Sequence, residues 1–234
     1  MDKLYIIIPA YNEADTIAQV VQEWHTVVSR LNPQSRLVII DDGSKDNTVQ
    51  ILNNLQKNYP QLIILTKPNS GHGATLLYGY NYALAHNADF IFQTDSDGQT
   101  IADEFWPFWT QRQSFSAIIG QRKQRQDGWS RILVTKVLKF ILLIIFRVNI
   151  PDANTPFRLI SGITLAKYLG RIPEDFNLTN IILTVYLVKN KEKVKFLPIT
   201  FKPRQGGINS INLRKIIKIG GKALKDFWQI KKQI

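Results

Sequence analysis

Asp95 and Asp97, two aspartates separated by one residue, are the strongest candidates in this chain for a role in binding or catalysis. They follow the short apolar run at residues 90–92, and because a buried strand cannot hold bare charges, both acids must lie where the strand emerges. In an extended segment, Asp95, Asp97 and Gln99 would project to the same side. Three oxygen ligands suit a hard divalent cation, Mg²⁺ or Mn²⁺. The alternative is a solvated turn rich in Asp, Ser and Gly.

Polar residues also follow two other short apolar runs, at residues 4–8 and 37–40. Helical spacing of apolar residues covers 17–31, and a second helical pattern covers 48–58. Strands that alternate with helices predict an α/β fold with a mostly parallel central sheet, whose ligands bind beyond the carboxyl ends of the strands. We therefore expect the polar strand ends to meet at one crevice. They are Pro9, Ala10, Tyr11, Asn12 and Glu13 after the first run and Asp41, Asp42, Gly43 and Ser44 after the second.

Length and composition fit a single compact enzyme, because 234 residues with 44% hydrophobic content can bury a full core. Cysteine is absent, which excludes disulfides and thiolate metal sites and is compatible with a reducing, cytosolic location. The five apolar residues between Lys3 and Pro9 are too few for a signal peptide. No stretch reaches the roughly 18 apolar residues that span a bilayer. We expect a protein that stays on the cytoplasmic side.

Most of the positive charge lies at the end of the chain. Residues 1–188 hold 17 Lys and Arg and 16 Asp and Glu, whereas residues 189–234 hold 13 and 2, so +11 of the net +12 lies in the last 46 residues. Apolar residues in 211–234 fall near one helical face and basic residues on others, which predicts a basic amphipathic helix on an anionic membrane surface. A helix packed on the domain and a nucleic-acid-binding patch are the alternatives.

Residues 130–148 form a second candidate for a membrane-facing segment. All seven residues from 140 to 146 are apolar, but Lys136, Lys139 and Arg147 interrupt or bound the segment, so it is too short and too charged to span a bilayer. A helix of this kind can lie in the membrane interface with its basic side chains reaching the headgroups. A plain buried helix is the alternative. A separate membrane-spanning protein is a further candidate partner.

Taken in order, four polar motifs resemble those of family 2 glycosyltransferases. The motifs are residues 9–13, residues 41–44, the segment with Asn69, Gly71, His72, Gly73 and Ala74, and residues 95–99. The resemblance covers about residues 3–210 and is closest to the dolichyl- or polyprenyl-phosphate mannose and glucose synthase branch, whose metal motif also ends in Gln. It implies a nucleotide-diphospho-sugar transferase (GT-A) fold, a sugar-nucleotide donor, a divalent metal and inversion at the anomeric carbon.

The resemblance also implies a role on the donor side for each matching residue. Pro9, Ala10, Tyr11 and Glu13 would line the base and ribose pocket, and Asp42, with Asp41 as the alternative, would accept a ring N–H of uracil or guanine. Asn69, Gly71, Gly73 and Ala74 would bring a glycine-rich backbone close to the nucleotide. Asp95 and Ser96 would contact the nucleotide, and Asp95, Asp97 and Gln99 would hold Mg²⁺ or Mn²⁺ on its diphosphate.

The acceptor side would come from the second half of the chain. Arg122 matches the family's Gly-x-Arg, and Arg131 opens the interfacial segment; both could bind a phosphate through two hydrogen bonds. Residues 152–158 resemble the family's Asp-x-x-Ser-Gly-Phe-Arg loop, with Thr155 and Pro156 in place of Ser-Gly. The expected acceptor residues are Arg122, Arg131, Asn154, Arg158, Arg204 and Ser210, with Asp97, Asp152, Arg122 and Arg131 as the catalytic set.

These features predict a glycosyltransferase domain over residues 1–210 and a basic amphipathic helix over 211–234. The first 120 residues would form the nucleotide-sugar half and 121–210 the acceptor half. The expected reaction moves a hexose from a UDP- or GDP-sugar to a polyprenyl or dolichyl phosphate at the inner membrane face. An ionised lipid phosphate needs little general base. Transfer to a hydroxyl would need one, for which Asp152 is the candidate, and a basic nucleic-acid-binding protein remains the alternative outside enzymes.

Overall fold

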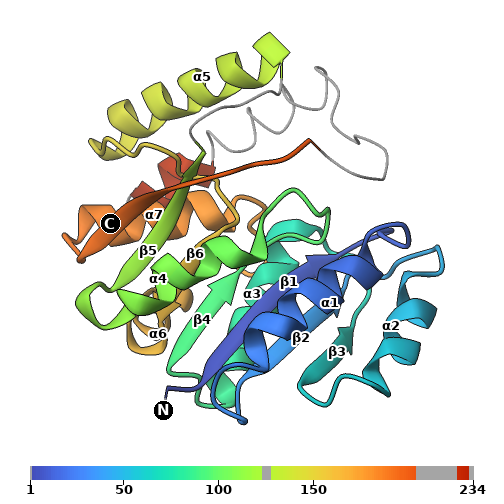
Figure 1. Cartoon of the computed structure of the whole chain (residues 1–234). Coiled ribbons are helices and arrows are strands. Elements are labelled where there is room, and N and C mark those ends of the chain that lie inside the picture. The colour runs from blue at the N-terminus through green and yellow to red at the C-terminus, as the bar shows by residue number, and fades with distance from the viewer. Residues whose placement is uncertain (1, 123–127, 204–225, 232–234) are drawn as a thin grey trace.

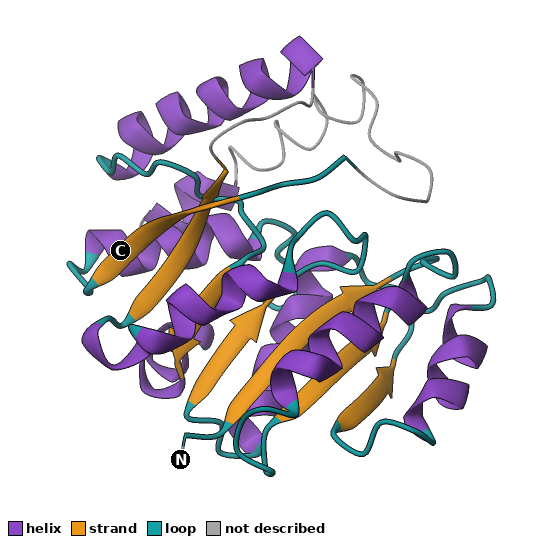
Figure 2. Cartoon of the chain, in the orientation of Figure 1, coloured by secondary structure: helices purple, strands orange, loops and turns teal. Residues whose placement is uncertain are grey.

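The computed structural model describes residues 2–122, 128–203 and 226–231, without side-chain detail for 128–136. Its centre is a seven-stranded sheet in the order β3-β2-β1-β4-β6-β5-β7. The strands are β1 (Leu4–Ala10), β2 (Arg36–Asp41), β3 (Leu62–Thr66), β4 (Phe90–Gln93), β5 (Ala117–Arg122), β6 (Arg158–Ser161) and β7 (Val194–Ile199). Helices lie on both faces of this sheet (Figure 2).

The first half of the sheet is entirely parallel. β1 pairs with β2 on one side and β4 on the other, and β2 pairs with β3. The crossovers are α1 (Ile17–Val28), α2 (Thr48–Gln56) and α3 (His72–Ala85). β1 and β2 are buried throughout except at Arg36, as expected for strands covered on both faces. The predicted strand and helix alternation is confirmed in this half.

The second half introduces the antiparallel element. β6 runs antiparallel to both β4 and β5, whereas β7 lies parallel to β5 at the far edge. Four of the six strand pairings are therefore parallel, and the predicted mostly parallel sheet is confirmed. The helical elements here are η1 (Ala102–Phe105), α4 (Trp106–Thr110), η2 (Arg112–Ser114), α5 (Gly128–Phe146), α6 (Gly162–Leu169) and α7 (Thr179–Lys189).

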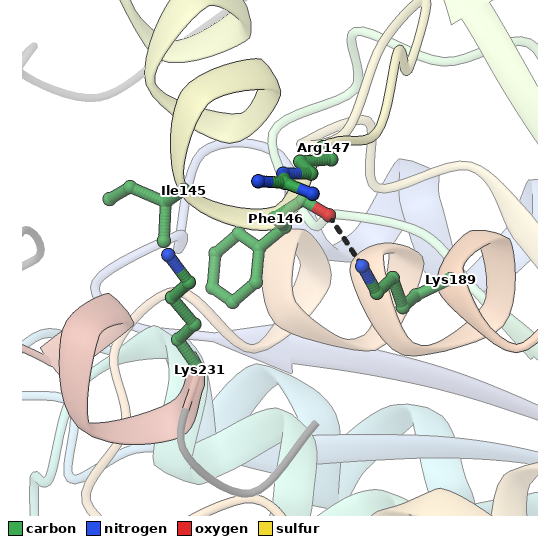
Figure 3. Close-up of a pocket in the computed structure, with 5 residues that line it drawn as sticks. All are labelled: Ile145, Phe146, Arg147, Lys189 and Lys231. Carbon is green, nitrogen blue, oxygen red and sulfur yellow. Dashed lines mark hydrogen bonds between the residues drawn. The ribbon is translucent and has the colours of Figure 1, made fainter.

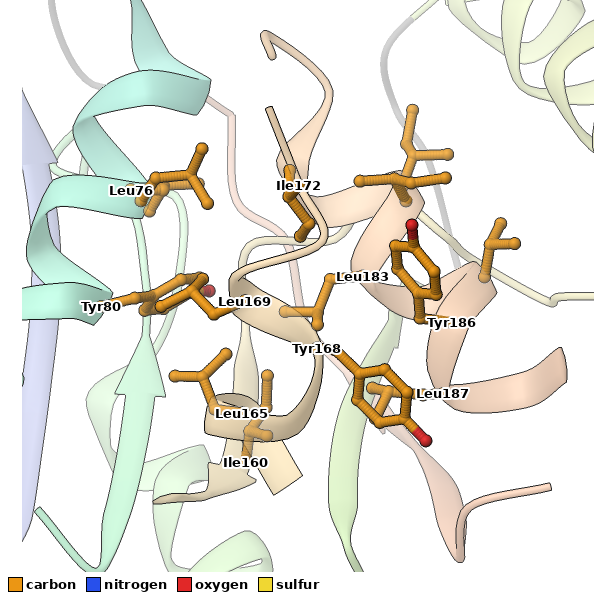
Figure 4. Packing of buried hydrophobic residues seen from close by; sticks show 14 of the residues in the cluster. Leu76, Tyr80, Ile160, Leu165, Tyr168, Leu169, Ile172, Leu183, Tyr186 and Leu187 are labelled. Atoms are coloured by element: carbon orange, nitrogen blue, oxygen red, sulfur yellow. The ribbon is translucent and has the colours of Figure 1, made fainter. Parts of the chain in front are cut away.

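Each face of the sheet carries its own hydrophobic layer, because alternate residues of a strand point to opposite faces. Leu4, Ile6 and Ile8 of β1 belong to the layer under α1, where Trp24 lies 5.2 Å from the ring of Phe92. Tyr5 and Ile7 belong to the opposite layer, which α3, α5, α6 and α7 cover. In that layer the rings of Tyr168 and Tyr186 stack at 5.8 Å between α6 and α7 (Figure 4).

The helix α5 is partly buried and partly exposed. Leu142, Ile145 and Phe146 contact the core, whereas Phe140 is 62% exposed. Figure 1 shows α5 at the end of the molecule toward which β1 and β4 point. Within the described residues, no helix combines the length and the apolar character that crossing a bilayer would require.

The described part of the predicted C-terminal helix packs on the domain. Residues 226–231 are helical, and Phe227 and Ile230 are buried in the layer that contains α5. The ring of Phe227 lies 5.7 Å from that of Phe146 and 6.2 Å from that of Phe176. Residues 226–231 therefore form a helix packed on the domain, which was the alternative to a helix on the membrane surface. Residues 211–225 lie outside the described residues, and their membrane role stays a prediction.

Replacing Phe227 by Ala tests this docking. We expect Phe227→Ala to lower the free energy of unfolding by about 3 kcal/mol, because it removes a buried ring from a filled layer. Trp228→Ala is the matched control, since Trp228 is 55% exposed, and it should cost no more than about 0.5 kcal/mol. Urea unfolding measures both, and equal losses for the two variants would contradict the packing of this helix.

Candidate active site

The polar strand ends lie together, as the sequence predicted. β1, β2 and β4 are neighbours in the sheet, and hydrogen bonds join the loops that follow them. Asn12 N donates to Ser44 Oγ at 2.9 Å, and Thr16 Oγ1 donates to the carbonyl of Ser96 at 2.9 Å. The loop after β1 is thus tied to the loops after β2 and β4, which forms the crevice edge of a parallel sheet.

Asp42 organises the loop after β3. Its Oδ1 accepts from Ser70 N at 2.9 Å and from the ammonium group of Lys67, and its Oδ2 accepts from Gly71 N at 2.9 Å. Asn69 completes the contact by donating to the Asp42 carbonyl at 2.8 Å. Burial by itself would raise the pKa of Asp42, but these hydrogen bonds outweigh it and hold the pKa below the usual 3.8.

Asp41 has a structural task in its own turn. It is 2% exposed, and its carboxylate accepts from the backbone N–H groups of Gly43 and Ser44. Gly43 has a φ of +71°, a conformation that glycine adopts without steric cost. Both Asp41 and Asp42 are therefore engaged by protein donors, and a direct hydrogen bond from a nucleotide base to either stays a prediction.

Lys67 is a site residue that the sequence reading missed. It lies directly after β3, and its side chain is 12% exposed where it pairs with Asp42. The signal was available, because β3 ends at the same edge of the sheet as β1 and β2. A polar residue at that strand end falls under the same rule that singled out Asp41 and Asp42.

The segment after β4 bends, and the predicted extended geometry is wrong. Residues 96–98 form a bend in which Gly98 has a φ of +70°. Asp95, Asp97 and Gln99 are therefore not on one side of an extended strand. Asp97 Oδ1 accepts from Gln99 N at 3.1 Å, which is turn chemistry. Gln99 is 6% exposed and donates through Nε2 to the Lys202 carbonyl at 2.8 Å.

Asp95 differs from its neighbours because one of its oxygens is buried without a hydrogen bond. Asp95 Oδ1 has no hydrogen-bond partner among the described residues, and Nε2 of His72 lies 3.9 Å from it. A buried, unpaired carboxylate oxygen costs free energy, so it marks a place that a ligand would satisfy. The described residues contain no cluster of three or more His, Cys, Asp or Glu side chains that could bind a metal without help from a substrate.

The two glycines before and within the first turn of α3 have different tasks. Gly71 has a φ of +90° and donates its N–H to Asp42, so it shapes the loop. A Cβ atom on Gly73 would lie 2.1 Å from the carbonyl oxygen of Phe176 and 2.6 Å from the Cα of Asn177. Glycine is therefore required at position 73 because the backbone at 176–177 packs against it. The sequence had suggested another reason, the close approach of this backbone to the nucleotide. Ala74 follows within the same helix.

Arg122 and Asp152, predicted separately, form one unit. Nε of Arg122 donates to Asp152 Oδ2 at 2.7 Å and Nη2 donates to Oδ1 at 2.8 Å, a bidentate ion pair. Both side chains are more than nine-tenths buried, and the guanidinium carbon lies 5.1 Å from the ring centre of Phe201. This pair joins the carboxyl end of β5 to the loop that precedes β6.

Arg158 corrects the predicted acceptor set. Its side chain is 0% exposed, and it donates to the carbonyls of Thr155, Asn180 and Ala153 and to Thr184 Oγ1. A guanidinium that holds buried carbonyls cannot at the same time bind a lipid or sugar phosphate. Burial lowers the pKa of Arg158, and the nearby Tyr80, Asp152 and Asp95 partly offset this effect.

The other predicted residues are distributed as follows. Glu13 is 8% exposed beside Thr16, Tyr11 is 42% exposed, and Asn154 is exposed in the loop before β6. Pro9 and Ala10 end β1, and Ser96 is buried. The side chain of Arg131 and the residues Arg204 and Ser210 lie outside the described residues.

The loops of the crevice lie in a segment that matches one protein family. The model of the family described as "Glycosyl transferase family 2" matches residues 5–161, which contain all four motif loops and the Arg122–Asp152 pair. The chain belongs to this family. The match begins in β1 and ends with β6, so it covers the part of the sheet that builds the crevice.

Two curated relatives of this family 2 glycosyltransferase carry names from the lipid-phosphate branch. The undecaprenyl-phosphate 4-deoxy-4-formamido-L-arabinose transferase of Proteus mirabilis is 27% identical over 146 residues, which are 61% of this chain and 44% of the relative. The dolichyl-phosphate beta-glucosyltransferase ALG5C of Trichomonas vaginalis is 35% identical over 105 residues, 42% and 30% of the two chains. The matches thus span less than half of either relative. The predicted similarity to the lipid-phosphate branch of the family is confirmed.

Solved structures share the fold of the family 2 chain. A crystal structure of glucosyl-3-phosphoglycerate synthase from Mycobacterium tuberculosis with Mn²⁺, UDP and glucosyl-3-phosphoglycerate superposes with a TM-score of 0.70 and 14% identity, covering 99% of this chain and 80% of the other. A second structure of that synthase, with Mn²⁺, UDP-glucose and phosphoglyceric acid, gives a TM-score of 0.68 at 14% identity, covering 97% and 80%. The predicted GT-A fold is confirmed.

Replacing Arg158 distinguishes a structural role from acceptor binding. We expect Arg158→Ala to lower the free energy of unfolding by about 4 kcal/mol, because three buried carbonyls lose their donor. Arg171→Ala, at an exposed arginine whose guanidinium carbon lies 5.6 Å from the ring centre of Tyr168, should cost less than about 1 kcal/mol. A normal unfolding curve for Arg158→Ala with a raised acceptor KM would contradict the structural assignment.

The lowered pKa of Asp42 predicts that the free energy of unfolding decreases in acid. Because the folded-state pKa is lowered, the carboxylate stabilises the fold above its unfolded pKa, and this contribution disappears as the pH falls through the folded pKa. Asp42→Asn should lower the free energy of unfolding by about 3 kcal/mol at neutral pH, with a smaller difference from wild type in acid. Urea unfolding across the pH range measures this. The exposed Asp15→Asn is the control, and a difference for Asp42→Asn that does not shrink in acid would refute the linkage.

Proposed function

We propose that this chain is an inverting, metal-dependent hexosyltransferase. It moves a hexose from a UDP- or GDP-sugar to a polyprenyl or dolichyl phosphate at the cytoplasmic face of a membrane. The observation that carries the proposal is the family match over residues 5–161, since that segment contains every loop of the crevice. The names of the two relatives support a lipid-phosphate acceptor.

The residues present fit a divalent cation that is shared with the donor diphosphate. Asp95 Oδ1 is buried and has no hydrogen-bond partner in the part of the chain that the structure describes, and Asp97 lies in the bend that follows Asp95. When bound, Mg²⁺ or Mn²⁺ would neutralise the charge that develops on the leaving nucleoside diphosphate. Crystal structures of the glucosyl-3-phosphoglycerate synthase in complex with Mn²⁺ and UDP support this assignment. Gln99 supports the bend through Lys202 and is assigned to positioning.

The sugar-nucleotide donor would bind across the loops after β1, β2 and β4, which hydrogen bonds join to one another. Pro9, Ala10, Tyr11 and Glu13 border the crevice on the β1 side, and Asn69, Gly71 and Ala74 border it on the α3 side. The hydrogen bonds of Asp41 and Asp42 fix these loops before a ligand binds, so less ordering is required when the nucleotide arrives. His72, beside Asp95, is a candidate donor to a phosphate oxygen.

The Arg122–Asp152 pair supports a phosphate acceptor over a hydroxyl acceptor. Both oxygens of Asp152 accept from Arg122, so this carboxylate is poorly placed to remove a proton from a sugar hydroxyl. A lipid monophosphate is largely ionised at neutral pH and reacts without such a base. Arg122 would then present its remaining nitrogen to the acceptor, with Arg131, Asn154, Arg204 and Ser210 as further candidate contacts.

The location on the membrane is part of the same proposal. The α5 helix exposes Val137, Phe140, Leu143 and Ile144, which are 48% to 62% exposed. An amphipathic helix with apolar residues on its outer face can lie in the headgroup region of a bilayer. A membrane-spanning partner protein would be an additional anchor.

A transfer assay tests the proposal with the full chain. The wild type, given UDP- or GDP-hexoses with Mg²⁺ or Mn²⁺, should label a short-chain polyprenyl phosphate and leave the matching polyprenol unlabelled. Asp97→Asn should lower the turnover at least about a hundredfold, because the diphosphate loses charge stabilisation. Asp103→Asn, an exposed acid outside the crevice, is the control.

The outcomes separate the parts of this proposal. Labelling of the polyprenol or of a saccharide, with none of the phosphate, would replace the acceptor assignment. Full turnover of Asp97→Asn in the presence of either metal would remove Asp97 from the metal site. Removal of the metal by a chelator should stop the wild-type reaction, and added metal should restore it.

A further inference from the structure

Three basic side chains from three separate elements meet at the last turn of α5. Arg147 follows this helix, Lys189 ends α7, and Lys231 comes from the C-terminal helix. Together with Ile145 and Phe146 they line a hollow of about 240 Å³ (Figure 3). None of the three has been assigned to the donor or acceptor site, and the hollow is separate from the Asp95 bend.

The floor of this hollow is apolar and its rim is cationic. Ile145 and Phe146 are 4% and 2% exposed, whereas the three basic residues are exposed. Lys189 Nζ donates to the Phe146 carbonyl at 3.1 Å and the ammonium of Lys231 lies 4.7 Å from the ring centre of Trp228. Figure 3 shows Lys231 reaching up from the C-terminal helix and Lys189 reaching in from the right, both toward the end of α5, where Arg147 lies.

Arg147 occupies a backbone conformation that usually belongs to glycine. Its φ is +59°, directly after the end of α5, where a left-handed residue commonly ends a helix. A non-glycine residue costs about 1 kcal/mol or more in this conformation. An arginine here places a cation at the rim of the hollow at the expense of local backbone stability.

The charge of the cluster exceeds what the helix ends need. The carboxyl ends of α5 and α7 each carry about half a negative charge, or about one in total. Three cations line the hollow beside these helix ends, and none of the three forms an ion pair with an acidic side chain in the described part of the chain. About two positive charges therefore remain for an anion.

The surface beside the cluster is apolar. Phe140, Leu143 and Ile144 are 62%, 50% and 57% exposed, and they lie on the outer face of α5 within about two turns of Arg147. Trp228, 55% exposed, lies on the C-terminal helix beside Lys231. An apolar strip that ends in a cationic hollow matches the chemistry of a phospholipid surface, with hydrocarbon beside phosphate.

We propose that Arg147, Lys189 and Lys231 form a binding site for the phosphate of an anionic phospholipid headgroup. The apolar side chains of α5 and Trp228 enter the adjacent acyl region, so the hollow fixes which face of the domain meets the bilayer. This site deepens the proposed membrane function, on which it rests for its choice of ligand. It is distinct from the acceptor site at Arg122.

Vesicle co-sedimentation of the full chain, without donor or acceptor, tests the site. The probes are phosphatidylcholine vesicles and vesicles that contain phosphatidylglycerol as the minority lipid. The triple variant Arg147→Gln, Lys189→Gln, Lys231→Gln should bind the anionic vesicles at least about tenfold more weakly than wild type. The control triple Arg30→Gln, Lys57→Gln, Lys193→Gln removes the same charge from exposed positions elsewhere and should lose no more than about threefold.

Two further arms identify the source of the phosphate and the role of the apolar strip. Inorganic phosphate, compared with chloride at equal ionic strength, should leave vesicle binding unchanged. Leu143→Ser with Ile144→Ser should weaken binding to the anionic vesicles while the melting temperature stays unchanged, because both side chains are exposed.

Each contrary result overturns the site. Equal losses in the two triple variants would indicate diffuse charge attraction, and full competition by inorganic phosphate would assign the hollow to a soluble anion. Self-association through α5 without vesicle binding would assign the face to a second copy of the chain. Donor hydrolysis in vesicle-free solution is measured in parallel, since its loss counts against the proposed transfer reaction and leaves the headgroup site standing.

Discussion

A buried guanidinium supports both halves of this protein. Arg158 begins β6, the strand that joins the parallel half of the sheet to β5 and β7, and its donors hold the loop before β6 and the first turns of α7. A buried charge is expensive unless its hydrogen bonds are satisfied, so this network specifies one arrangement of the surrounding backbone. Asp95 and Asp152 lie close enough to interact electrostatically with Arg158. The carboxylates of Asp95 and Asp152 thus both interact with the guanidinium of Arg158, which is fully buried from solvent.

The crevice is formed largely before any ligand arrives. Asp42 uses its carboxylate to hold the loop of Ser70 and Gly71, Asp41 shapes its own turn, and Asn12 joins the first two loops. Unlike the carboxylates of Asp41 and Asp42, Asp95 has an oxygen that is buried without a hydrogen-bond partner in the described part of the chain. Rigid loops around one unsatisfied carboxylate are a suitable arrangement for a site in which a charged ligand must be oriented.

Patterns along the chain were sufficient for the first strands and helices and for the location of the crevice, whereas the antiparallel β6 was not predicted. Apolar runs at 4–8 and 37–40 became β1 and β2, and their polar ends met because parallel strands end at one edge. The extended form expected for 95–99 was wrong because Gly98 turns the chain. Local composition favours both a strand continuation and a bend, and the contact of Gln99 with Lys202, 103 residues later, selects the bend.

The sequence alone determined the family, the alternation of strands and helices and the set of strand-end residues, because these depend on short-range periodicity and motif spacing. Only the tertiary structure decided what those residues do. It paired Arg122 with Asp152, buried Arg158 under the crevice and brought Arg147, Lys189 and Lys231 to one hollow. Burial and pairing depend on partners far apart in the chain, and no local pattern encodes which distant carbonyl or carboxylate will satisfy a given arginine.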